Sequence, residues 1–233
     1  MSSILIKPRV PAIQTTAFIF FFILFSFFRV CVFGVSTKGL VGYWTFDHNA
    51  HDISGYNHNG IFQHSPVFVP GVTRLCPDFG SSENYVVVSN SDARLTILRA
   101  CTVETWIRGR NFDQGYHHIF RKENSYTLSI YDGNVAVATT QGWWKSGKTR
   151  LPIDRWVHAA WTWDGSYQRI YIDGKEVVGG PASGTFPNGG KIYISHPVHP
   201  FKGLIDEVKV YCRALTAAEI ESSYFEGLTL VGY

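Results

Sequence analysis

Several features that define common classes of protein are scarce or absent in this chain. Its 233 residues include only four cysteines, and no Asn-x-Ser/Thr sequence is present. N-glycosylation is therefore not expected. The Gly-x-Ser-x-Gly elbow of many hydrolases is missing, and long helical patterns are few. What remains is a chain rich in aromatic residues (15%) and in glycine (22 residues).

The chain also has little excess of charge of either sign. The net charge of +3 comes entirely from Lys7, Arg9 and Arg29, and the rest of the chain carries 18 basic and 18 acidic residues. Proteins that bind nucleic acid need a basic field to neutralise phosphates. We therefore exclude nucleic acid as a partner.

Residues 1–34 have the pattern of a secretory signal peptide. Two basic residues precede an apolar run over residues 17–28. Small or neutral residues at positions 32–34 then provide a site for signal peptidase. The twelve residues of the apolar run would form a helix of about 18 Å, too short for a hydrocarbon core of ~30 Å. We predict cleavage, which gives a secreted, extracellular protein with one domain over residues 35–233.

The alternative is an uncleaved signal anchor through residues 17–35. This segment would attach the protein to a membrane, but it would place Arg29 inside the apolar span, which is costly. A membrane partner is expected only under this alternative.

Cysteine usage fits an exported protein. Cys31 lies in the leader, which leaves Cys76, Cys101 and Cys212. An odd number permits at most one intramolecular disulfide and leaves one spare thiol. The sequence does not decide which two cysteines pair.

Short apolar runs with period-two alternation, rich in β-branched and aromatic residues, recur along the chain. This pattern predicts strands at residues 40–46, 85–88, 101–107, 125–131, 134–138, 156–163, 169–172 and 191–194. Asp-Gly pairs at 132–133, 164–165 and 173–174 lie between runs and predict tight hairpin turns. Four tryptophans in these runs are predicted to lie in the core: Trp44, Trp106, Trp156 and Trp161. Many short strands separated by turns predict an all-β sandwich.

The end of the chain predicts one strand followed directly by one helix. Residues 204–211 mix apolar and charged side chains as a half-buried strand does. Thr216 precedes Glu219 by three residues, which is a capping box at a helix start. Gly227 is the predicted end of this helix.

Seven blocks in order resemble the laminin G-like (LamG-like) domains of the concanavalin A-like lectin/glucanase superfamily. They lie at residues 42–47, 52–60, 79–88, 102–107, 156–165, 171–175 and 201–220. The resemblance implies a two-sheet antiparallel jelly-roll sandwich with a short C-terminal helix. Cys212 stands where the family usually has Asn, which suggests a disulfide between Cys212 and either Cys101 or Cys76.

The resemblance also raises the prospect of a structural Ca²⁺ ion between the first and last strands. Asp47, Asp52, Asn57 and Asp206 are the candidate ligands, since Ca²⁺ prefers carboxylate and amide oxygens. The alternative for Asp52 is a turn in which the carboxylate bonds its own backbone.

Two amphipathic loops are the candidate ligand sites. One, over residues 141–150, carries Trp143, Trp144 and Lys145, and the second, over residues 111–118, carries Tyr116 and His117. Aromatic rings stack on sugars, and the basic residues near Trp144 would favour anionic glycans. The alternative is that a tryptophan folds back as a lid on the sandwich.

Catalysis is not expected. Glucanases of the superfamily carry carboxylates on one strand as Glu-x-Asp-x-Glu, and this motif is absent. Glu104 stands alone, and adjacent Asp206 and Glu207 are predicted to point to opposite faces. We predict a secreted, non-catalytic binding module for an extracellular glycan or matrix glycoprotein. The alternatives are a structural, adhesive protein-interaction module and, less favoured, an unrecognised glycoside hydrolase.

Overall fold

A computed structural model describes residues 36–80, 84–89, 95, 99–112, 114–140, 142–145, 150–184, 186–187 and 189–231, with the side chains of residues 143–145 and 231 excepted. By contact density the chain divides into Met1–Phe33 and Gly34–Tyr233, and all described residues belong to the second unit. The leader lies outside the described residues, so its cleavage stays a prediction.

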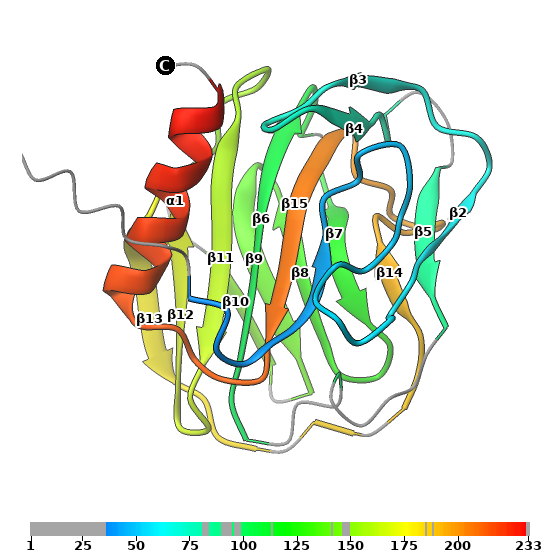
Figure 1. Cartoon of the computed structure of the whole chain (residues 1–233). Helices are drawn as coiled ribbons and strands as arrows, with labels where there is room; N and C mark the ends of the chain where they lie inside the picture. The colour runs from blue at the N-terminus through cyan, green and yellow to red at the C-terminus, as the bar shows by residue number, and fades with distance from the viewer. Residues whose placement is uncertain are drawn as a thin grey trace, which may run out of the picture. The chain divides into compact units, whose positions relative to one another are not determined.

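Two antiparallel sheets face each other (Figure 1). The six-stranded sheet has, in spatial order, β1 (Leu40–Trp44), β15 (Gly203–Tyr211), β6 (Cys101–Gly109), β11 (Val157–Trp163), β12 (Tyr167–Ile172) and β13 (Lys175–Pro181). The seven-stranded sheet has β10 (Gly142–Lys145), β9 (Asn134–Thr139), β8 (Tyr126–Tyr131), β7 (Tyr116–Lys122), β14 (Ile192–Ile194), β5 (Tyr85–Val88) and β2 (Ile61–Gln63). The predicted all-β jelly-roll sandwich is confirmed.

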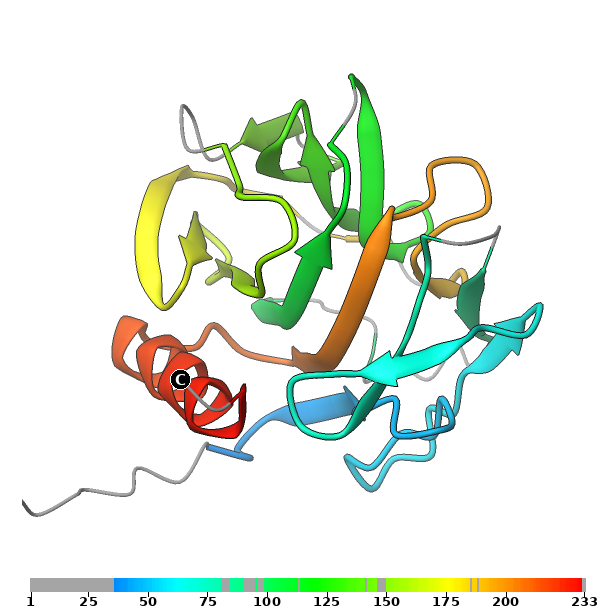
Figure 2. The ribbon, with the colours of Figure 1, turned by 90° about the horizontal axis from the view of Figure 1, so that it is seen from above.

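Two smaller elements cover the six-stranded sheet. A short hairpin, β3 (Phe68–Pro70) and β4 (Leu75–Pro77), lies at one end, and helix α1 (Ala217–Val231) packs on the outer face (Figures 1 and 2). Within the part of the chain that the structure describes, no helix is both long and apolar enough to cross a membrane.

The main core lies between the two sheets. Along β8, Tyr126, Leu128 and Ile130 alternate with outward side chains and are fully buried in it, as the period of a strand requires. Trp44 and Trp161 join the same cluster. Trp106 and Trp156 are buried as well, but in a separate cluster on the outer side of the six-stranded sheet. The predicted burial of all four tryptophans is confirmed.

Helix α1 is held on the sheet by a buried polar contact as well as by apolar packing. The Glu104 carboxylate accepts hydrogen bonds from Ser223 Oγ (2.8 Å) on the helix and Tyr211 Oη (3.2 Å) on β15. Burial alone would raise the pKa of Glu104, but His158 and the charge of Lys209 outweigh it and hold that pKa below its usual value. Both of these hydrogen bonds end at Oε1 of Glu104, which links α1 to β15, while Oε2 lies 3.6 Å from His158 Nε2.

The start of α1 has the predicted capping box. Thr216 Oγ1 accepts from the Glu219 N–H (3.3 Å), and Glu219 Oε2 accepts from the Thr216 N–H (2.9 Å). The predicted Asp-Gly turns are also present, since Asp132 and Asp173 adopt φ of 48° and 49° before glycines. Both features depend on local chemistry, which is why short sequence patterns predict them.

The predicted helix end at Gly227 is wrong. The helix continues to Val231, and a Cβ at Gly227 would overlap the indole of Trp106. This glycine is needed for close packing of helix on sheet and not for a turn.

The predicted disulfide is also not present, because the three described cysteines are free thiols. Cys101 is buried between the sheets, Cys76 is buried in the outer cluster with Trp106, and Cys212 is exposed. Cys101 and Cys212 flank the paired residues Thr102 and Tyr211 of β6 and β15, but one thiol is buried and the other is exposed.

We predict that Gly227→Ala lowers the free energy of unfolding by about 1–3 kcal/mol, because the added methyl group overpacks against Trp106. Alanine would otherwise favour an exposed helix by about 1 kcal/mol. Urea unfolding measures the change, with Glu221→Ala on the exposed side of α1 as the control. A more stable Gly227→Ala protein would contradict the packing role.

Candidate functional site

The outer face of the seven-stranded sheet collects aromatic and polar side chains. On β8, Thr127, Ser129 and Tyr131 alternate with the core residues and therefore point away from the core. His118 on β7 is paired with Ser129 in the register. A loop from Ser195 to Phe201 adds further residues, because the His118 N–H donates to the carbonyl oxygen of His199 (2.9 Å).

Five of these side chains form what we call the aromatic–histidine cluster: Tyr116, His118, Tyr131, His196 and His199. The ring centroids of Tyr116 and Tyr131 are 4.8 Å apart. The His118 ring lies 5.2 Å from that of His196 and 5.2 Å from that of His199, both edge to face. Tyr116, Tyr131 and His196 are partly exposed and His199 is exposed, so the cluster presents rings to solvent above a rigid sheet.

Two histidines of the cluster, His118 and His196, are held uncharged at neutral pH. His118 Nδ1 lies 2.7 Å from Ser129 Oγ, and burial, followed by the nearby His196 and Arg121, lowers its pKa to about 3. Burial and Arg121 lower the pKa of His196 to about 4. At neutral pH these two histidines are therefore neutral hydrogen-bonding groups beside the tyrosine rings, with Arg121 as the adjacent cation.

An open groove continues from Arg121 along the same face. It has a volume of about 420 Å³ and is lined by residues that include Arg121, Thr127, Ala138 and Thr139. Hydroxyl and guanidinium groups beside partly exposed rings can bind the hydroxyls and the apolar faces of a polyhydroxylated ligand.

Two predicted loops are strands in the structure. Tyr116 begins β7, and residues 142–145 form β10, the edge strand that pairs with β9. Both predicted ligand sites therefore belong to one sheet. The backbone of Trp143 is opposite Ala138 in the register. The side chains of Trp143, Trp144 and Lys145 lie outside the described residues.

Of the two candidates on β7, only Tyr116 lies in the cluster. His117 is 5% exposed, and its Nδ1 lies 3.2 Å from the carbonyl oxygen of Pro200. It therefore contacts the Ser195–Phe201 loop through Pro200.

Sequence reasoning missed His196, His199 and Tyr131, and it did not select His118, although the second candidate loop ends at that residue. The alternation of β8 contains a signal for Tyr131, because its partners two and four residues earlier also face outward. The two loop histidines carry no such signal, since only the fold of the Ser195–Phe201 loop brings them to β7.

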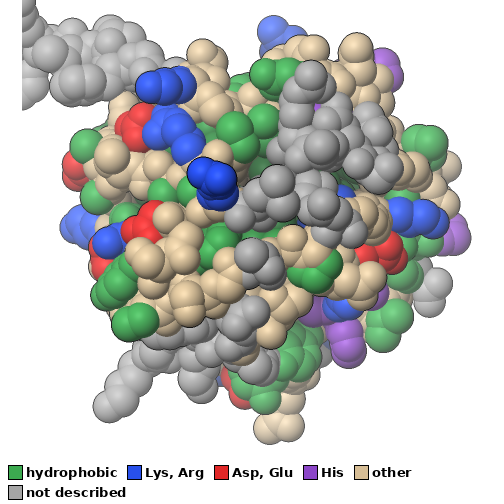
Figure 3. All heavy atoms as spheres, turned by 90° about the horizontal axis from the view of Figure 1, so that it is seen from below, with side chains coloured by type: hydrophobic (Ala, Val, Ile, Leu, Met, Phe, Trp, Pro, Cys, Tyr) green, Lys and Arg blue, Asp and Glu red, His purple; other side chains and the backbone are tan. Residues whose placement is uncertain are grey.

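Charge is mixed on one face of the molecule. On the face shown in Figure 3, blue and red side chains are interspersed with hydrophobic and neutral ones. Arg150, one of the basic residues expected to favour anionic glycans, donates to the carbonyl oxygen of Phe112 (3.2 Å).

The four candidate metal ligands fall into two places. Asp52 and Asn57 lie in the loop after β1, where the Asp52 carboxylate accepts from the N–H groups of Tyr43, Ser54 and His58 (each 2.9 Å) and from Ser54 Oγ (2.8 Å). This is the turn that we considered as the alternative for Asp52. All of its bonds come from its own loop and from β1.

Asp206 lies on β15, near Asp47. Its Oδ2 accepts from the Val72 N–H (2.8 Å), while Asp47 Oδ1 accepts from the Leu75 N–H (3.2 Å). Burial, and then the charge of Glu207, raise the pKa of Asp206 to about 8. Among the described residues, no group of three or more His, Cys, Asp or Glu side chains is arranged to hold a metal ion. Calcium binding stays a prediction.

The prediction that Asp206 and Glu207 point to opposite faces is wrong. A bulge interrupts β15 between Asp206 and Lys209, and Glu207 has φ of 52°. Glu207 therefore bonds Thr73 Oγ1 (3.0 Å) while Asp206 bonds Val72. Both carboxylates are buried and tie the segment before β4 to β15.

The sheet order and the closing β15–α1 segment agree with a family match. The Laminin_G_3 model, described as the concanavalin A-like lectin/glucanases superfamily, matches residues 79–221. The chain therefore belongs to this superfamily. Among curated protein sequences, none matches it significantly.

Solved structures with the same fold are distant in sequence. Domain 4 of AbnA, an extracellular GH43 arabinanase from Geobacillus stearothermophilus, in complex with arabinotriose, has a TM-score of 0.68 at 19% identity, over 78% of this chain and 96% of that domain. The binding domain of Paraclostridial Mosquitocidal Protein 1 has a TM-score of 0.69 at 19% identity, over 81% of this chain and 52% of its own.

The binding domain of botulinum neurotoxin DC in complex with SialylT has a TM-score of 0.67 at 14% identity, over 82% of this chain. The match covers 52% of the toxin chain, so this chain spans about half of the length of the toxin structures.

We predict that the neutral His118 makes stability fall on acidification. The unfolded chain takes up a proton near pH 6.5 and the folded chain only near pH 3, so stability present above pH 6.5 is lost as the pH falls towards 3. Between pH 7 and 5 this group accounts for about 2 kcal/mol.

Melting temperatures at pH 7 and pH 5 test this prediction. His118→Gln should reduce the loss on acidification, whereas His51→Gln, at an exposed position, should leave it unchanged. An identical loss in His118→Gln and the parent protein would show that His118 does not govern it.

Proposed function

We propose that the protein is a secreted, non-catalytic module that binds extracellular glycan chains through the outer face of the seven-stranded sheet. The observation that carries the proposal is the aromatic–histidine cluster beside the groove at Arg121. Partly exposed rings that are fixed on strands lose little entropy on binding, and neighbouring hydroxyl groups can fix the orientation of a sugar.

The charges of this face favour neutral sugars over strongly anionic ones. Burial keeps His118 and His196 uncharged at neutral pH, and Arg121 is the described cation that lies beside them. The overall charge outside the leader is balanced. We therefore change the expectation of anionic glycans to one of neutral or singly charged glycans.

The fold relatives support binding in general terms. The AbnA domain was solved with arabinotriose and the botulinum neurotoxin DC domain with SialylT. The absence of catalysis is part of our proposal. It draws support from the buried state of Asp206, which accepts from the Val72 N–H, and of Glu207, which accepts from the hydroxyl groups of Thr73 and Tyr43. Paired catalytic carboxylates must instead reach a substrate.

A protein partner is the second candidate. Ile61 on β2 and Val198 in the loop beside the cluster are 64% and 69% exposed, and apolar side chains at a surface can contact a protein. The neurotoxin DC binding domain was also solved with rat synaptotagmin II.

We predict that Tyr131→Ala weakens glycan binding by about tenfold or more, because an aromatic anchor at the centre of a site carries much of its affinity. Trp143→Ala should weaken it as well if that ring joins the surface. A glycan array, followed by calorimetry on the best ligand, measures both effects. Tyr167→Ala on β12 of the other sheet is the matched control. Equal binding by all four proteins would exclude this face.

We retain Ca²⁺ as a separate proposal for Asp47 and Asp206. We predict that CaCl₂ added to chelator-treated protein raises the melting temperature, since a ligand of the folded state stabilises it. Asp47→Asn should remove the effect. If calorimetry shows no heat and the melting temperature does not move, calcium has no role.

A further inference from the structure

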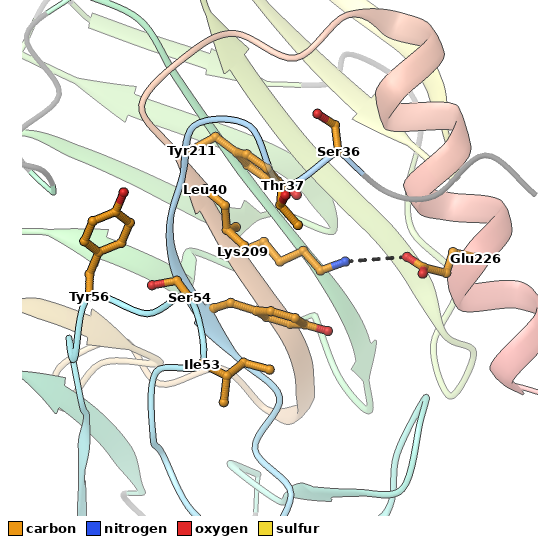
Figure 4. Close-up of a pocket in the computed structure, with 10 residues that line it drawn as sticks. Ser36, Thr37, Leu40, Ile53, Ser54, Tyr56, Lys209, Tyr211 and Glu226 are labelled. Atoms are coloured by element: carbon orange, nitrogen blue, oxygen red, sulfur yellow. Dashed lines mark ion pairs between the residues drawn. The ribbon is translucent and has the colours of Figure 1, made fainter.

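A second groove lies on the opposite side of the molecule, on the outer face of the six-stranded sheet. It has a volume of about 670 Å³ and runs between the segment before β1, the loop after β1, strand β15 and helix α1 (Figure 4). This volume falls in the range of small-molecule sites. The groove contains no residue of the aromatic–histidine cluster.

The charged pair across this groove is incompletely bonded. Lys209 is 8% exposed and its ammonium Nζ points across the groove towards helix α1 (Figure 4). Its ion-pair partner, Glu226 Oε2, is 4.0 Å away, which is beyond hydrogen-bonding distance. Within the described residues, neither the ammonium of Lys209 nor the carboxylate of Glu226 makes a hydrogen bond. A largely buried ammonium in this state lacks acceptors.

A hydroxyl group can satisfy both partners at once. Two hydrogen bonds of ~2.8 Å that meet at one hydroxyl oxygen span ~4–4.6 Å between their outer atoms. The 4.0 Å between Lys209 Nζ and Glu226 Oε2 fits that span. The hydroxyl would accept from the ammonium and donate to the carboxylate, whereas an ionised carboxylate oxygen of a ligand can only accept.

The remaining walls suit a sugar ring. The ring of Tyr43 carries the Lys209 ammonium at 5.0 Å from its centroid, and Tyr56 and Ile53 on the facing loop are 39% and 58% exposed. Figure 4 shows both of these side chains on the same side of the groove as Ser54. Apolar and aromatic surface therefore lies beside a donor–acceptor pair.

We propose that this groove is a second saccharide subsite, which takes an uncharged sugar and places one hydroxyl between Lys209 and Glu226. The proposal rests on the proposed function as a glycan-binding module. Negative charge argues against an acidic ligand, because Glu226 lies in the groove and Glu207 bonds the hydroxyl of Tyr43. Two subsites on opposite faces would allow one protein to bridge two glycan chains.

NMR titration of the labelled protein tests the proposal with arabinotriose and cellotriose as neutral probes and sialyllactose as an acidic probe. We expect a neutral probe to shift the amide signals of Ile53, Tyr56 and Glu226. Glu226→Gln should weaken this binding by about tenfold, since a charge-assisted hydrogen bond is replaced by a weaker one. Glu221→Gln, on the same helix and exposed, should leave it unchanged.

Three results would overturn the proposal: no probe shifts the groove signals, Glu226→Gln binds as tightly as the parent, or sialyllactose binds there best and more tightly to Glu226→Gln. Glu226 is exposed on α1, so its variant should fold. Signals of Tyr131 and His199 report the other face in the same titration. If Tyr131→Ala abolishes the ligand-induced shifts of these signals but not those of the groove signals, the two sites bind independently. The titration therefore tests each site separately.

Discussion

The structure depends on the pairing of β15 with β1 on one side and β6 on the other. This strand comes last in the chain, but it lies inside the six-stranded sheet and joins the first strand to the rest. Its Ile205, Val208 and Val210 enter the main core. The sandwich can therefore close only when residues more than 160 positions apart pair, as Tyr43 and Lys209 do. Such non-local pairing costs loop entropy and needs a large buried core to offset it.

The bulge in β15 directs neighbouring side chains of this strand to different contacts. The extra residue allows Asp206 and Glu207 to bond the segment at Val72 and Thr73, while Lys209 faces the groove beside α1. A regular strand would have sent the two carboxylates to opposite faces. Bulges commonly redirect side chains in this way. The closing strand thus fixes the β3–β4 hairpin and also forms a wall of the second groove.

Sequence alone predicts those parts of the fold that depend on local patterns. Alternation identified most strands, and the Thr216–Glu219 capping box and the Asp-Gly turns were correctly placed because neighbouring residues make them. The prediction failed where distant residues decide. Gly227 packs on Trp106, which is 121 positions away in the sequence, and the three described cysteines are free although the sequence suggested a disulfide. The edge strand β10 is recognised only through its pairing with β9.

In the candidate site, too, local patterns predicted some residues, and contacts between distant parts of the chain decide the others. Tyr116 was found from its amphipathic surroundings, whereas His196 and His199 belong to the site only because a loop crosses β7. The core uses the inward residues of β7 and β8, and the cluster uses their outward residues and the loop. Partly exposed residues of the cluster such as Tyr131 can therefore be substituted without disrupting the core. His118 is different, because it is 5% exposed and bonds Ser129. It packs against the rings of His196 and His199, so its protonation affects both the stability of the fold and the surface that the cluster forms.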